Sequence, residues 1–378
     1  MAQLRVLATA CALTLLSGSL VDDTALGDAP RSGLFERAAT YTATGLAAGP
    51  GRRVVVADFN SDSARDVAVT TLGRLLVFLN NGDGTFGVPA QYPGVEGGSA
   101  FFGVAAADFD GDGAPDIAAT DFNHASVLVF LNRGNGTFAP AVSYFADNFP
   151  DGVAVTDVDR DTDIDLAVAA AHPPGGLTVL LNNGNGTFGS QQLFGVAGSG
   201  RDVAVGNFNA DTAPDLAVSS FGLNNVAILL NNGNGTFGTA IDYAVGDAPT
   251  GVATGDINVD SAEDLVVANA GSNTVSVLFG LGDGSFRPAV NYAAGLSPVT
   301  PTIANFAGNR SPEVAVANSA GSPTVSVLLN RGDGRFVMPF VASTTFAPSG
   351  VASGDLNTDG RTDLAVATRG NLTVLLHR

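Results

Sequence analysis

Residues 108–116 read Asp-Phe-Asp-Gly-Asp-Gly-Ala-Pro-Asp, and a second motif, Asn-Arg-Gly-Asn-Gly-Thr-Phe, follows at residues 132–138. Both motifs recur along the chain. The acidic motif starts at seven positions that lie 49 or 50 residues apart: Asp58, Asp108, Asp157, Asn207, Asp256, Asn305 and Asp355. Such a constant period is the signature of a repeat architecture, in which one structural unit is copied along the chain.

Residues 103–148 illustrate the repeating unit. Apolar stretches at 103–108, 117–120, 126–131 and 138–144 predict four short strands, separated by the acidic loop, a short connection and the Gly-rich turn. The two middle strands are apolar on consecutive residues, which suits a sheet that is covered on both faces. The pattern predicts an all-β protein in which each repeat is one four-stranded antiparallel blade of a β-propeller.

The ends of the chain predict how the ring closes. The last repeat stops after its third strand, at Val374–Arg378, whereas Leu34–Tyr41 has the pattern of a fourth strand such as Ser285–Tyr292. We expect the N-terminal strand to complete the last blade, because closure removes exposed sheet edges. Residues 34–378 are therefore predicted to form one domain, a seven-bladed propeller.

The net charge indicates which binding partners are excluded, and the N-terminal residues indicate the cellular compartment of the protein. The formal net charge is −19 and all 17 basic residues are Arg, so we expect no binding to nucleic acid. Residues 1–27 predict a signal peptide and short leader, with an apolar run from Val6 to about Leu16, although the cleavage site stays open. We expect a secreted, periplasmic or cell-surface protein with no transmembrane segment after the signal. The single cysteine, Cys11, excludes an intramolecular disulfide.

The seven acidic loops, numbered in chain order, predict metal sites. Oxygen-bearing side chains stand at positions 1, 3, 5 and 9, and Ca²⁺ prefers six to eight oxygen ligands in flexible geometry. The predicted ligands are Asp58, Asn60, Asp62 and Asp66 in loop one, Asp108, Asp110, Asp112 and Asp116 in loop two, Asp157, Asp159, Asp161 and Asp165 in loop three, Asn207, Asn209, Asp211 and Asp215 in loop four, Asp256, Asn258, Asp260 and Asp264 in loop five, and Asp355, Asn357, Asp359 and Asp363 in loop seven.

The loops are not equally equipped for a cation. Loops two and three have four acids each, loops one, five and seven have three, and loop four has two. Loop six has Ala307 at position 3 and only one acid, Glu313. We expect about five to six structural Ca²⁺ sites, with affinity falling in that order. The alternative is that these loops are solvated Asx turns that only close hairpins.

Both motifs together resemble the FG-GAP/VCBS repeat family, which includes the propeller of integrin α chains. Asp108 to Asp116, the strand that follows it, and the turn that ends at Phe138 carry the resemblance in this chain. The resemblance implies that the loops between first and second strands hold Ca²⁺. It also implies a non-enzymatic role in protein–protein or cell-surface interaction, with an unknown protein or glycan as partner. We expect a monomer.

Two other functions stay open. A carbohydrate-binding propeller is favoured if one aromatic residue per repeat is exposed, and the residues at that position are Tyr92, Tyr144, Phe194, Tyr243 and Tyr292. Packing of these rings against the next blade is the simpler interpretation. An enzyme that uses Asp carboxylates is also open in so acidic a chain, although the sequence distinguishes no catalytic pair.

Overall fold

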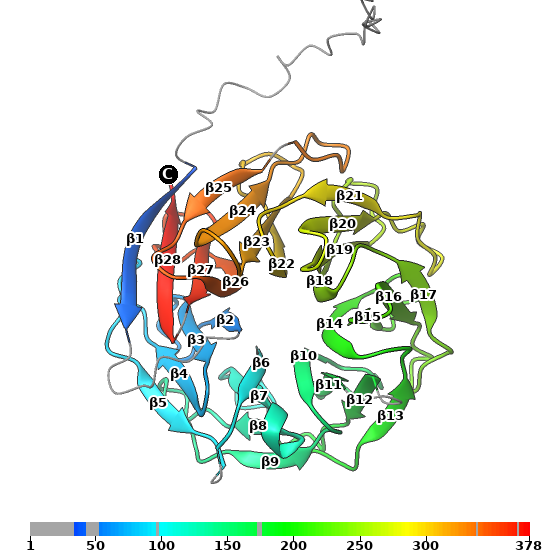
Figure 1. Cartoon of the computed structure of the whole chain (residues 1–378). Helices are drawn as coiled ribbons and strands as arrows, with labels where there is room; N and C mark the ends of the chain where they lie inside the picture. Colours follow the sequence, from blue (N-terminus) through cyan, green and yellow to red (C-terminus); the bar gives the residue numbers. More distant parts are fainter. Residues whose placement is uncertain (1–33, 43–52, 96–97, 172–175, 338, 369) are drawn as a thin grey trace, which may run out of the picture.

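A computed structural model describes residues 34–42, 53–95, 98–171, 176–337, 339–368 and 370–378. These residues form seven four-stranded antiparallel sheets, arranged as a ring around one axis (Figure 1). The predicted all-β, seven-bladed propeller is therefore confirmed. The helical element among the described residues is one 3-10 turn, η2 (Phe122–His124). The predicted signal peptide and leader, residues 1–27, lie outside the described residues.

The strands occupy four concentric positions. The innermost are β2 (Val54–Ala57), β6 (Phe101–Ala107), β10 (Pro150–Thr156), β14 (Gly200–Gly206), β18 (Pro249–Gly255), β22 (Pro298–Ala304) and β26 (Pro348–Gly354). The second are β3 (Asp66–Thr70), β7 (Asp116–Asp121), β11 (Asp165–Ala170), β15 (Asp215–Ser220), β19 (Asp264–Asn269), β23 (Glu313–Asn318) and β27 (Asp363–Thr368). The third are β4 (Arg74–Phe78), β8 (Ser126–Phe130), β12 (Gly176–Leu180), β16 (Asn225–Leu229), β20 (Thr274–Leu278), β24 (Thr324–Leu328) and β28 (Asn371–His377). The outermost are β5 (Ala90–Pro93), β9 (Val142–Phe145), β13 (Gln192–Gly195), β17 (Ile241–Ala244), β21 (Val290–Ala293), β25 (Phe340–Ser343) and β1 (Phe35–Thr42).

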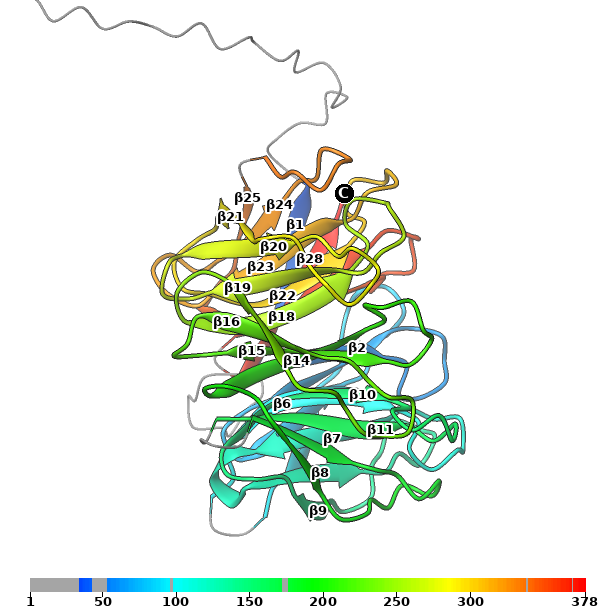
Figure 2. The ribbon, with the colours of Figure 1, turned by 90° about the vertical axis from the view of Figure 1, so that its right-hand side faces the viewer.

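Six blades follow the chain in order, from blade 1 (β2–β5) to blade 6 (β22–β25). Seen from the side, strands β6 to β9 of blade 2 follow one another from the axis to the rim (Figure 2). Blade 7 consists of β26, β27 and β28, and β1 pairs with β28 in antiparallel register, with Phe35 opposite His377. The N-terminal strand thus closes the ring as predicted.

The outermost strand of blade 2 begins later than expected. In blade 2 the sequence predicts a strand over residues 138–144, whereas β9 spans Val142–Phe145. Phe138 instead forms an isolated bridge with Asn132, and the same bridge recurs in six turns. Pro140 lies between the bridge and β9, and its missing N–H prevents a continuous ladder.

The core lies between the blades. Second and third strands are buried on both faces, and each interface between adjacent blades contains a cluster of buried apolar side chains. The cluster between blades 1 and 2 contains Leu75, Ile117 and Phe130, each at most 1% exposed. Full burial of side chains of this size contributes about 1.5–3 kcal/mol each. Apolar burial is therefore the main force that holds one blade to the next.

A buried asparagine in the Gly-rich turn adds a polar connection between blades. The Nδ2 of Asn182 donates to the Phe109 carbonyl of the previous blade at 2.8 Å and to the Ile164 carbonyl of its own blade at 3.0 Å. Asn80 makes the corresponding bond from blade 1 to Leu356 of blade 7, again at 2.8 Å. The asparagines in this position are Asn80, Asn132, Asn182, Asn231 and Asn330. We call them the clamp asparagines.

At the axis, the first strands of adjacent blades approach closely. A Cβ on Gly103 would lie 2.4 Å from the Asp151 carbonyl oxygen, so a larger residue there displaces the next strand. Arg53 occupies the same repeat position in blade 1, and its guanidinium reaches Asp202 of blade 4 at 2.7 Å. Both side chains are largely buried. This ion pair joins two blades that are not neighbours.

The clamp can be tested with two adjacent asparagines. We expect Asn182→Ala to lower the free energy of unfolding by about 1–3 kcal/mol, because it removes the amide donor of the Ile164 carbonyl and leaves the Phe109 carbonyl with only the Gly186 N–H. Asn183→Ala is the matched control, since exposed Asn183 bonds only to Thr187 within the same turn. Chemical denaturation of both variants gives the comparison. Equal losses in the two variants would contradict the clamp.

Candidate metal sites in the acidic loops

Each acidic loop connects the first strand of a blade to its second, and in the five loops that have Asp at position 1 this carboxylate accepts N–H groups of the loop. Asp108 accepts the N–H groups of Gly111 and Gly113, both at 2.8 Å. These glycines have φ of 76° and 89°, in the left-handed region that favours Gly. Arg160 and Thr162 take the same conformation in loop three, with φ of 67° and 83°. The loop shape is therefore kept even where no Gly is present.

The position 9 acid is the buried centre of each loop. Asp116 is 0% exposed; its Oδ2 accepts the Phe109 N–H at 2.8 Å and its Oδ1 the Asn132 N–H at 2.6 Å. The same pair of bonds recurs at Asp66, Asp165, Asp215, Asp264 and Asp363. In blades 1 to 5 these carboxylates therefore join the acidic loop to the Gly-rich turn of the same blade, whereas Asp363 joins its loop to His377 at the end of β28. This role is separate from metal binding.

Burial sets the protonation of the position 9 acids in the metal-free loops. Desolvation raises the pKa of Asp66, Asp116 and Asp264 to about 6, and that of Asp165 to about 7, against the opposing effect of the two backbone hydrogen bonds. Neighbouring carboxylates of the same loop raise these values further. A cation held nearby would favour the ionised form of these acids.

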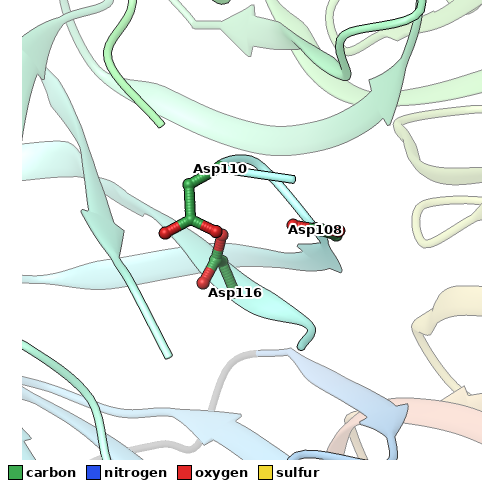
Figure 3. Close-up of side chains that lie close together, drawn as sticks. All are labelled: Asp108, Asp110 and Asp116. Atoms are coloured by element: carbon green, nitrogen blue, oxygen red, sulfur yellow. The ribbon is translucent and has the colours of Figure 1, made fainter. Parts of the chain in front are cut away.

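Loops two and three bring three carboxylates together. Asp108, Asp110 and Asp116 each place an oxygen within 4.8 Å of the others, and Figure 3 shows Asp110 and Asp116 facing each other. Asp157, Asp159 and Asp165 form the equivalent cluster in loop three. The Oδ1 of Asp159 is buried without a hydrogen-bond partner. Burial, followed by repulsion from the neighbouring acids, raises the pKa of Asp110 and Asp159. The chemistry of this oxygen set fits a hard divalent cation.

The position 5 acids of these two loops point elsewhere. Asp112 accepts the Ala114 N–H at 2.8 Å, and Asp161 accepts the Asp163 N–H at 2.9 Å, as in Asx turns. Neither belongs to the three-carboxylate clusters. The structure thus brings three of the four predicted ligands together in each loop.

In loops one, four, five and seven the predicted ligands bond to one another. The position 3 amide donates to the position 5 carboxylate, as in the 2.8 Å bond from Asn60 to Asp62, and the other pairs are Asn209–Asp211, Asn258–Asp260 and Asn357–Asp359. At position 1, Asp58, Asp256 and Asp355 accept loop N–H groups, whereas Asn207 is exposed. A cation in these loops requires the amide to turn its oxygen inward.

Loop six differs from the others in its buried acid. The Oε2 of Glu313 accepts the N–H groups of both Phe306 and Ala307, at 2.7 and 2.9 Å. Its Oε1 is buried without a hydrogen-bond partner. The longer side chain therefore concentrates its bonds on one oxygen and does not make the bond to the turn that Asp116 makes in loop two.

The recurring aromatic residues of the outermost strands pack against the next blade. Tyr92, Tyr144, Tyr243 and Tyr292 lie edge-on to the turn phenylalanine of that blade, at centroid distances of 5.3–5.5 Å, and Phe194 does so at 5.1 Å. All five are half-buried. Packing between blades, the simpler of the two interpretations of these residues, is what the structure shows.

Hollows lie beside three of these tyrosines, between adjacent blades at the rim. Their volumes are about 410 Å³ at Tyr92, about 510 Å³ at Tyr243 and about 630 Å³ at Tyr292. The repeat pattern does not predict these hollows, because each is built from residues of two successive repeats. Turns that depart from the repeat pattern, such as the one with Arg331 and Arg335, are the feature of the sequence that could have indicated them.

Within the described part of the chain, no helix has the length and apolar character needed to cross a membrane.

The comparisons with known proteins agree on the fold. The model of the FG-GAP-like repeat family matches residues 58–119, 108–168, 157–218, 207–267 and 305–366. Among solved structures, BBS1N in complex with ARL6DN, in a mercury-soaked crystal, is similar with a TM-score of 0.63 and 12% identity, over 91% of this chain and 97% of that one. A lectin from Agrocybe aegerita that recognises non-reducing terminal N-acetylglucosamine has a TM-score of 0.54 and 19% identity, over 84% of this chain and 86% of that one. No curated protein matches the sequence.

The raised carboxyl pKa values predict how pH affects the chelated protein. Asp165 titrates at about 7 in the folded chain and at its ordinary 3.8 when unfolded, so the unfolded state releases its proton first as the pH rises. Stability should therefore fall between about pH 4 and pH 7, and saturating Ca²⁺ should remove that fall by holding the acids ionised. Melting temperatures measured with and without chelator, in high salt to screen general repulsion, test this. A melting temperature that rises with pH in the chelated protein would contradict it.

Proposed function

Since the chain belongs to the FG-GAP-like repeat family, we propose that it is a secreted, calcium-stabilised β-propeller that serves as a non-enzymatic binding module for a protein or a cell-surface glycan. The observation that carries this proposal is a division of roles within the repeat. The clamp asparagines and position 9 acids recur and hold the ring together. The exposed second residue of the Gly-rich turn varies, from Asn81 to Arg133 to Leu281. A constant frame with a variable surface is what a binding scaffold needs.

The similar structures support binding of either class of partner. One of them was crystallised with a protein, ARL6DN, and the other recognises a terminal sugar. A glycan is the second candidate for this chain, and the hollows beside Tyr92, Tyr243 and Tyr292 favour it because they combine aromatic rings with polar groups.

A structural role for Ca²⁺ follows from the position of the loops. The clusters of loops two and three lie directly beside the clamp bonds, since the carbonyl of Phe109 accepts from Asn182 while its N–H donates to Asp116. A cation bound by Asp108, Asp110 and Asp116 would stiffen the loop that the next blade contacts. The backbone bonds of the position 9 acids also support a non-enzymatic role, because both oxygens are held by N–H donors.

Secretion rests on residues 1–27, whose basic start, apolar run and small residues have the pattern of a signal peptide. A location outside the cytoplasm is also consistent with Ca²⁺ sites and with a cell-surface partner. The acidic net charge of −19 favours a partner other than nucleic acid.

Calorimetric titration of the chelated protein tests the metal sites. We expect several Ca²⁺ ions per chain, tightest binding in loops two and three, and a higher melting temperature after loading. Asp110→Asn, which gives loop two the position 3 residue of loop one, should weaken its site about tenfold. The reciprocal change Asn60→Asp should strengthen loop one. A stoichiometry near zero would refute calcium binding, and seven equal sites would refute the order.

Binding assays with the Ca²⁺-loaded chain test the module. We expect saturable binding to an extracellular protein or to a glycan on an array, and loss of that binding after chelation and partial unfolding. A chain that binds neither class but turns over a substrate, with activity abolished by substitution of one carboxylate, would make the protein an enzyme instead.

A further inference from the structure

The hollow between blades 5 and 6 is lined by three arginines. Its volume of about 630 Å³ lies within the range of ligand pockets in proteins, about 300–1,000 Å³. Arg287 follows the turn of blade 5, whereas Arg331 and Arg335 belong to the turn of blade 6. The remaining lining residues are Phe279, Pro288, Val290, Tyr292 and Phe336. We call this site the arginine hollow.

The other repeats show what normally stands at these positions. Where Arg331 stands, three of the other five turns have Asn, as in Asn183, and the remaining two have Arg133 and Leu281. Where Arg335 stands, the other turns have Thr or Ser, and where Arg287 stands, they mostly have Gly. Three such positions in six turns make eighteen, of which four are Arg, and three of those four line this one hollow. The hollow at Tyr243 contains Asp242 and no arginine. The hollow at Tyr92 contains one arginine, Arg133, so of these three hollows the one at Tyr292 alone gathers three.

The turn of blade 6 has Arg335 in place of a threonine and lacks the hydrogen bond that the threonine hydroxyl makes in other turns. In the turn of blade 3, the Thr187 hydroxyl donates to Asn185 at 2.6 Å, and Thr137 does the same in blade 2 at 2.7 Å. Arg335 retains only the backbone bond, from its N–H to Asp333 at 3.1 Å. A residue that breaks a local rule without structural gain is expected at a functional site.

The three guanidinium groups are scarcely neutralised. The side chains of Arg287 and Arg331 make no hydrogen bond or ion pair with the described residues. Arg335 lies 3.8 Å from Asp333, with both side chains exposed, an arrangement that contributes little. All three arginines are exposed, so water and salt screen their mutual repulsion, and their donors are free to bind an oxyanion.

The tyrosine in this hollow also differs from its counterparts. The hydroxyl of Tyr92 accepts the Phe138 N–H at 3.2 Å, and that of Tyr243 accepts the Phe286 N–H at 3.2 Å. The hydroxyl of Tyr292 has no partner among the described residues, although its ring packs on Phe336 in the same way. A half-buried hydroxyl thus remains available in the hollow.

We propose that the arginine hollow binds an acidic saccharide, a sugar that bears a carboxylate or a sulfate. Guanidinium groups bind such oxyanions through paired hydrogen bonds, and the Tyr292 hydroxyl and aromatic rings suit the rest of a sugar. A single open hollow of about 630 Å³ favours a saccharide over an acidic peptide, which typically binds along a groove or a strand edge. This inference rests on the proposed binding function and names the ligand class for one site.

The test restores the ordinary turn residues. The triple variant Arg287→Gly, Arg331→Asn and Arg335→Thr takes residues that other blades already carry, so it should fold. Arg310→Ser is the matched control, because it removes an exposed arginine of loop six that lines none of the three hollows, and Ser63 and Ser261 stand at the same repeat position. Glucuronic acid, glucose 6-sulfate, glucose, inorganic sulfate and an oligo-glutamate peptide are titrated into the full Ca²⁺-loaded chain by calorimetry.

We expect the two acidic sugars to bind the unaltered chain, to bind the triple variant at least about tenfold more weakly, and to bind Arg310→Ser with unchanged affinity. Glucose should bind far more weakly than either acidic sugar. Equal binding to the triple variant, or no binding of the acidic sugars, would overturn the proposal. Tighter binding of oligo-glutamate, or of sulfate alone, would overturn the saccharide class. If the triple variant still binds a protein or glycan partner like the unaltered chain, the binding function stands and only this site is refuted.

Discussion

The ring depends on a carboxylate that cannot reach water. In blade 2, Asp116 is fully buried and its two oxygens hold the acidic loop and the Gly-rich turn at fixed positions. That turn places Asn132, whose amide reaches the Phe59 carbonyl of blade 1 at 2.8 Å. The buried acid thus fixes the loop relative to the turn within a blade, and the clamp asparagine fixes that turn relative to the adjacent blade. Because an unpaired buried carboxylate is costly, the loop and the turn have little freedom to separate.

Much of this frame could be predicted from the sequence, because it recurs. The period, the four strands per blade and the closing strand at Phe35–Thr42 all depend on patterns repeated seven times. The position 9 acids, predicted as loop ligands, are the first residues of the second strands, and one of their two backbone bonds reaches a turn about 15 residues away, which spacing alone does not bring into contact. The ion pair of Arg53 and Asp202 could not be predicted either, since it joins blades 149 residues apart across the axis.

Differences between repeats bear on function as much as their likeness does. One amide for carboxylate change at position 3 turns a cluster of repelling acids, as at Asp110, into a pair that satisfies itself, as at Asn60 and Asp62. In the turns of blades 5 and 6, arginines replace uncharged residues of the repeat, and these substitutions produce the arginine hollow. A ring of near-identical blades therefore holds distinct local chemistries, because exposed positions change without disturbing the clamps.

The pairing of β1 with β28 also determines when blade 7 can form during synthesis of the chain. The strand that is synthesised first, Phe35–Thr42, has its partner in Asn371–His377, about 330 residues later. At the usual 5–20 residues per second, a ribosome needs on the order of tens of seconds to deliver that partner. Until then β1 is an unpaired strand and blade 7 does not exist, while earlier blades already have neighbours to pack on. The nascent chain is thus an open arc of blades until Asn371–His377 pair with β1 and close the ring.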